Sequence, residues 1–174
     1  FMSLLSERTL YERGSRFGSD IFSDEEKSVV QENIEKLDAG LGSLLGEEDF
    51  AVYQQYEKTL PQRRSVDNLT QKLSYSGTPL GEEVAEKLIS IMASQEGAFV
   101  FTNDLSNGGP RSLNQSSPEE VETYLNERGV LNTQIFNQAQ EILNEDQLDT
   151  FLEQQLEEIE RIQRWSEMSS QRRG

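Results

Sequence analysis

The stretch LNEDQLDTFLEQQLEEIERIQRW, residues 143–165, decides the fold. Its apolar side chains recur every three or four residues, which is the spacing of one face of an α-helix: Leu148, Leu152, Leu156, Ile159, Ile162 and Trp165. The other side carries charges at the spacing of helix-surface ion pairs, such as Glu157 with Arg161. The stretch therefore predicts a long amphipathic helix that ends near residue 170.

Start and stop signals divide the rest of the chain into further helices. The same apolar spacing recurs in segments 23–44, 45–60, 61–76, 80–97 and 117–142. Ser117-Pro118-Glu119-Glu120 combines a capping hydroxyl, a proline in the first turn and a glutamate that can return a hydrogen bond. Pro61 either kinks its helix or starts a new one. We expect an all-α fold of five to six antiparallel, partly kinked helices, arranged as an extended bundle or a hairpin-like cradle.

The length of 174 residues suits one domain with tails. We expect a flexible lead-in over 1–21, a single helical domain over 22–170 and a disordered tail over 171–174. Glycine, asparagine, serine and proline crowd the region 98–117. A structureless segment of that length inside a domain is often functional, so we predict a mobile loop there.

Composition excludes several classes of function. The chain has 32 acidic and 16 basic residues and a formal net charge of −16, which argues against nucleic-acid binding. It has no cysteine and no histidine, so disulfides, Cys/His zinc sites and Ser-His-Asp triads are excluded. No run of residues is apolar for long enough to form an integral membrane segment. Paired carboxylates are the one enzymatic alternative, but the acids cluster at predicted helix starts and on polar faces. We therefore predict no enzyme, no catalytic residue, no metal and no cofactor.

Apolar and aromatic side chains are the candidate partner-binding residues. They are Phe50, Tyr53, Tyr56, Leu152, Ile159, Ile162 and Trp165. Helical spacing places the aromatic members in a core more often than on a surface. An exposed Trp165, close to the end of the last helix, would indicate a contact with a client protein or with a second copy in a homodimer.

A short motif recurs at the predicted helix starts, in which an apolar residue precedes a small or polar residue and then acids. The copies at residues 45–49 and 143–147 resemble the Leu-Thr-x-x-Gln motif of the Spy and CpxP group of small periplasmic helical proteins. The matching positions are Leu45 and Asp49 in the first copy, and Leu143, Asn144 and Gln147 in the second, with Asn144 in place of threonine. In local physical terms, each copy is a helix N-terminus with a cap and acids in its first turn.

The resemblance implies an elongated helical dimer without an active site, whose concave surface holds non-native or envelope proteins. It also implies a periplasmic location after removal of a leader. The resemblance implies a cradle that is typically basic, whereas this chain is acidic, so any holding of clients would have to rely on apolar patches or on different partners. We expect a non-enzymatic, chaperone-like protein of the cell envelope that binds a protein partner or client. The alternative is an intracellular acidic adaptor domain.

Overall fold

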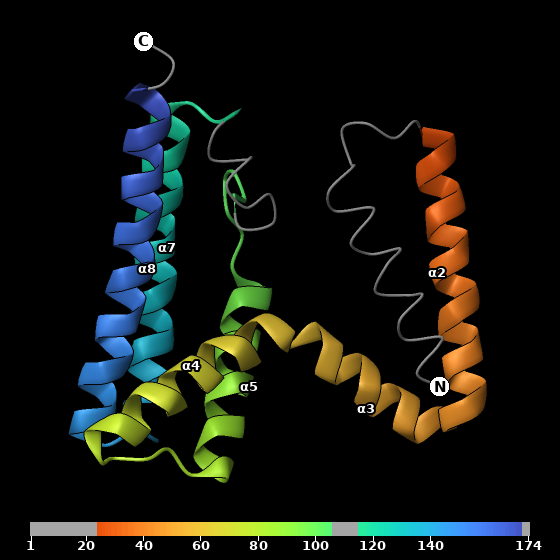
Figure 1. The fold of residues 1–174 in the computed structure, drawn as a ribbon, viewed down its shortest axis with the longest axis horizontal. Helices are drawn as coiled ribbons and strands as arrows, with labels where there is room; N and C mark the ends of the chain where they lie inside the picture. Colours follow the sequence, from red (N-terminus) through yellow and green to blue (C-terminus); the bar gives the residue numbers. More distant parts are fainter. Residues whose placement is uncertain (1–23, 106–114, 172–174) are drawn as a thin grey trace. The chain divides into compact units, whose positions relative to one another are not determined.

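The computed structural model describes residues 24–105 and 115–171, and it forms α-helices and no strand in these ranges (Figure 1). The helices described are α2 (Asp24–Leu45), α3 (Glu47–Lys58), α4 (Leu60–Ser76), α5 (Glu82–Ala98), α7 (Pro118–Ala139) and α8 (Glu145–Gln171). The prediction of an all-α fold is confirmed. The predicted lead-in over 1–21 and most of the predicted tail over 171–174 lie outside the described residues.

Contacts along the chain define two compact units, which meet in sequence between Lys58 and Thr59. The first unit holds α2 and α3, and the second holds α4, α5, α7 and α8. The sequence prediction of one domain over 22–170 does not anticipate this division.

The first unit is a corner between α2 and α3. Leu37 and Leu41 are buried on α2. Gly46 separates the helices with a φ of 83°, a left-handed conformation that favours glycine. A side chain at Gly42 would lie 3.4 Å from the ring of Phe50. The ring of Phe50 on α3 therefore packs against the end of α2 at Gly42.

Proline and glycine set the ends of α4. A turn at Thr59 separates α3 from α4, and Pro61 lies in the first turn of α4. The helix therefore restarts at this proline. At the other end, Gly77 adopts a φ of 84° and donates its backbone N–H to the carbonyl of Leu73. Thr78 donates to the same carbonyl at 3.1 Å, and α4 ends at Ser76, where the predicted segment 61–76 ends.

The second unit is a four-helix arrangement in which α4 packs on α5, α5 on α7, α7 on α8 and α8 on α4. Figure 1 shows α7 and α8 side by side and antiparallel, joined by a short connection. The shared core includes Val66, Leu69, Leu73, Leu88, Met92, Leu131, Ile135 and Phe151. Removing these side chains from water is the main force that holds the unit together.

The segment after α5 is attached to α7 as far as it is described. The ring of Phe101 lies 4.8 Å from that of Phe99 and 5.1 Å from that of Tyr124, centre to centre. Thr102 donates its backbone N–H to the carboxylate of Glu127 at 3.0 Å. Of the predicted mobile loop over 98–117, Phe101 and Thr102 thus contact α7, and residues 106–114 lie outside the described residues.

Candidate functional site

Two side-chain types that are common at catalytic and metal centres are missing from this sequence. The sequence has no histidine and no cysteine. Within residues 24–105 and 115–171, no three acidic side chains gather closely enough to hold a metal ion. None of the helices in these ranges is both long and apolar enough to cross a bilayer. Side chains converge instead in a polar layer, in two grooves and along an exposed apolar strip.

The polar layer joins the four helices of the second unit through Gln62 on α4, Glu96 on α5, Arg128 on α7 and Glu158 on α8. Arg128 Nη2 lies 3.4 Å from Glu96 Oε1 and 3.7 Å from Glu158 Oε1. Gln62 donates its side-chain amide to the other oxygen of Glu96. One arginine and two carboxylates thus join the helices, and this layer fixes how the helices align.

Some polar atoms in and beside this layer have no hydrogen-bond partner within the described part of the protein. They are Oε1 of Gln62, Nε of Arg128 and Nδ2 of Asn132. Gln62 and Asn132 are each only 7% exposed. An unpaired buried group costs about 1–3 kcal/mol, so the layer lowers the stability that apolar residues would provide.

The polar layer was missed at the sequence level, although a signal for it exists. Gln62 precedes Val66 by four residues, and Arg128 lies between Tyr124 and Leu131 at the same helical spacing. A polar residue in the phase of an apolar series is the pattern of a buried polar contact in a helical bundle. Taken singly, Gln62 and Arg128 are residue types that usually lie on the solvent-exposed face of a helix.

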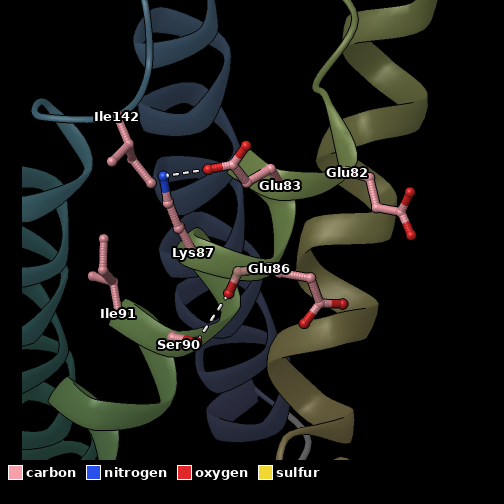
Figure 2. Close-up of a pocket in the computed structure, with 7 residues that line it drawn as sticks. All are labelled: Glu82, Glu83, Glu86, Lys87, Ser90, Ile91 and Ile142. Carbon is pink, nitrogen blue, oxygen red and sulfur yellow. Dashed lines mark hydrogen bonds and ion pairs between the residues drawn. The ribbon is translucent and has the colours of Figure 1, made fainter.

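The α5 groove is an open hollow of about 720 Å³ beside the first half of α5 (Figure 2). It is lined by Glu82, Glu83, Glu86, Lys87, Ser90, Ile91 and Ile142. Figure 2 shows the two isoleucines on one side of the hollow and the carboxylates of Glu82 and Glu86 directed away from them. The groove thus has an apolar wall and a charged rim.

Cations of the same chain already bind two of these rim carboxylates. Lys87 Nζ lies 2.7 Å from Glu83 Oε1. Arg63 donates two hydrogen bonds to Glu86, at 2.6 and 3.0 Å. The bonds from Lys87 and Arg63 lower the pKa of Glu83 and of Glu86, respectively. Both carboxylates are therefore ionised near neutral pH, which suits a solvated rim and not a general acid.

The second groove lies between α4 and α8, encloses about 380 Å³ and is polar. Lys72 Nζ lies 2.6 Å from Glu157 Oε2 across it. Gln154 donates its side-chain amide to the backbone carbonyl of Ser65 at 2.9 Å. These bonds join the two helices and account for much of the polar lining of this groove.

The apolar strip of α8 consists of Leu152, Leu156 and Ile159. Leu152 is 40% exposed and Leu156 is 52% exposed, while Ile159 is half-buried. At about 100° per residue, these side chains share one face of the helix. Phe151, which is 1% exposed, and Gln155 fill the core side of α8 in their place. Predicted binding residues Leu152 and Ile159 therefore lie together on this α8 strip.

The other two predicted binding residues of α8 lie off the strip. Trp165 is 42% exposed, but its position is about 140° around the helix from Leu152. Ile162 is half-buried and lies toward the core side. Trp165 and Met168, which is 58% exposed, give the end of α8 apolar surface of its own.

The aromatic residues of α3 do not form a buried cluster, and α3 has no buried residue. Phe50 and Tyr53 are half-buried, and their rings stack with centres 6.2 Å apart. Tyr56 is 50% exposed. The structure thus brings Phe50 and Tyr53 together, and all three aromatic residues belong to a different unit from the α8 strip.

The motif residues lie at, or just before, the starts of α3 and α8. Asn144 Oδ1 accepts from the backbone N–H of Gln147 at 3.0 Å, and Gln147 Oε1 accepts from that of Asn144 at 3.2 Å. Gln147 also donates to the carbonyl of Pro79 at 3.2 Å, and Leu143 is buried. In the first copy, Leu45 is half-buried and Asp49 is exposed in the first turn of α3. The second copy is therefore a capping box that also ties α8 to the segment before α5.

Compared with known proteins, the chain matches no family model, no curated protein and no solved structure. No relative therefore assigns a role to the α8 strip or to the grooves.

Proposed function

We propose that this chain is a non-enzymatic, chaperone-like protein that holds partner or non-native proteins through the α8 strip. The observation that carries the proposal is the exposure of Leu152 and Leu156, while Phe151, about 100° around the helix from Leu152, fills the core. Contiguous exposed apolar side chains with polar neighbours are typical of protein interaction sites. Gln154 and Glu157 make bonds that hold α8 on α4, and both lie on another side of the helix. These bonds therefore do not involve the face that carries Leu152 and Leu156.

The cell envelope is the proposed location, on the resemblance of the 143–147 motif to the Spy and CpxP group. Fractionation of cells that express the full-length gene product tests this part separately. Recovery with the envelope fraction supports the proposal. Recovery with the cytoplasmic fraction alone favours the intracellular adaptor.

Suppression of client aggregation tests the holding activity. Light scattering of a chemically unfolded client is followed with increasing amounts of the protein. We expect suppression by the wild type and its loss in the double variant Leu152→Ser with Leu156→Ser. Leu44→Ser is the matched control, since Leu44 is 61% exposed on α2. Equal suppression by all three proteins, or no suppression by the wild type at any ratio, would refute the proposal.

A further inference from the structure

A row of acidic side chains borders the α8 strip. Asp149, Glu153 and Glu160 are all exposed. At about 100° per residue they lie roughly 60–100° around the helix from Leu152, all on the same side. The strip is therefore an apolar band with negative charge along one edge.

Two of these acids have no cation beside them among residues 24–105 and 115–171. Glu160 has Arg164 as an exposed partner at 3.6 Å. Within the described ranges, neither Asp149 nor Glu153 forms an ion pair. By contrast, Glu157, Glu86 and Glu96 each pair with a cation on a neighbouring helix. Those acids support the fold, and the acidic row beside the α8 strip differs from them.

The charge pattern disfavours a second copy of this chain as the occupant. The formal net charge is −16, so two copies repel one another at low ionic strength. An antiparallel pair of α8 helices, packed strip against strip, would place one acidic row opposite the other. Like charges in facing rows destabilise such a pair.

We infer that the occupant of the α8 strip is a basic amphipathic segment, whose apolar face covers Leu152 and Leu156 and whose lysine or arginine side chains face Asp149 and Glu153. This inference rests on the proposed function and names the chemistry of the partner. An amphipathic helix laid along an apolar band is an established mode of recognition. Opposite charges along its edge add selectivity and speed of association.

Fluorescence anisotropy with two designed peptides tests the inference on the full chain. The first is a labelled helical peptide with leucine along one face and lysine beside it, and the second has glutamine in place of lysine. We expect the lysine peptide to bind about tenfold more tightly than the glutamine peptide at an ionic strength of about 0.1 M. The difference should largely disappear near 1 M, where charges are screened within about 3 Å.

Charge reversal supplies the matched controls. The pair Asp149→Lys and Glu153→Lys should weaken binding of the lysine peptide about tenfold. The pair Glu122→Lys and Glu141→Lys changes the net charge equally at other exposed positions, on α7 and just after it, and should have little effect. Equal losses from both pairs would show attraction by net charge alone and would overturn the inference.

Other outcomes separate this inference from the proposed function. Equal binding of both peptides, lost on Leu152→Ser with Leu156→Ser, overturns the basic partner and leaves client holding intact. Unchanged binding of the lysine peptide to that double variant places the peptide elsewhere and overturns the inference. Sedimentation that shows a dimer, dissolved by the same two substitutions, assigns the strip to a second copy and likewise overturns it.

Discussion

Arg128→Ala removes the cation at the centre of the polar layer. Arg128 serves two carboxylates on neighbouring helices, at 3.4 Å for Glu96 and 3.7 Å for Glu158. Without it, the one remaining partner of Glu96 among the described residues is the side-chain amide of Gln62. The substitution therefore leaves two negative charges in a partly buried setting and removes the apolar stem of the arginine.

The expected loss lies between the values for buried and surface pairs. Breaking a fully buried pair costs about 3–5 kcal/mol, and an exposed pair contributes about 0.2–1 kcal/mol. The side chain of Arg128 is 13% exposed, while those of Glu96 and Glu158 are 22% and 38% exposed. We expect about 2 kcal/mol, or a fall in Tm of roughly 4–8 °C.

Chemical and thermal unfolding followed by circular dichroism measures this loss. Arg164→Ala is the matched control, since Arg164 and Glu160 are 66% and 62% exposed; its effect should stay within about 0.5 kcal/mol. Arg128→Met should cost less than Arg128→Ala, since it restores apolar contacts. A change below about 0.5 kcal/mol for Arg128→Ala would refute the view that this layer joins the helices.

Three further predictions concern pH, a helix start and a backbone conformation. Burial raises the pKa of Tyr124 above 10.0, so its contribution to the free energy of unfolding is complete below that pH and is lost as pH rises through the raised pKa. Tyr124→Phe should therefore flatten the loss of stability with pH in alkaline denaturation. An unchanged slope of stability against pH would contradict this. Gln147→Glu keeps the capping acceptor but loses the donor to the carbonyl of Pro79. Urea unfolding at neutral pH should therefore show a fall of about 1–3 kcal/mol in the free energy of unfolding. A fall under about 0.5 kcal/mol would argue against that hydrogen bond. Gly77→Ala should lower the free energy of unfolding by about 1–2 kcal/mol, because the φ of Gly77 is 84°. Gly129→Ala, in the interior of α7 with open space around it, should raise the free energy of unfolding by about 0.5–1 kcal/mol. Shifts of the same sign in both variants would contradict the backbone explanation.

Helix ends were predictable because their causes are local. Ser117 accepts from the backbone of Glu120 at 3.2 Å, and Glu120 accepts from that of Ser117 at 2.7 Å. The residues of a capping box are all present within four positions of the sequence. The left-handed turn at Gly77 follows in the same way from a single residue.

The covered face of α8 was not predictable, since it depends on neighbours distant in sequence. Apolar residues occupy a wide arc of this helix, and periodicity selects Leu152 and Leu156 as readily as Phe151. Contacts with α4 and α7 bury Phe151 and leave the two leucines exposed. The helix was thus predicted correctly, while its orientation, which defines the candidate site, required the structure.

The division between the two units was also absent from the sequence pattern. Pro61 left a kink and a restart equally open, and the turn at Thr59 decides between them. Each helix at this point has its own apolar series. That spacing does not indicate that α3 and α4 belong to different units.

Thiol protection measures occupancy of the α8 strip most directly. The chain has no cysteine, so Leu156→Cys and Leu44→Cys each introduce a unique thiol at a position that is 52% or 61% exposed. Rates of thiol modification are compared with and without an unfolded client. The proposed function predicts that the client slows modification at position 156 and leaves the rate at position 44 unchanged. Equal rates at position 156 with and without a client that is demonstrably held in solution would contradict it.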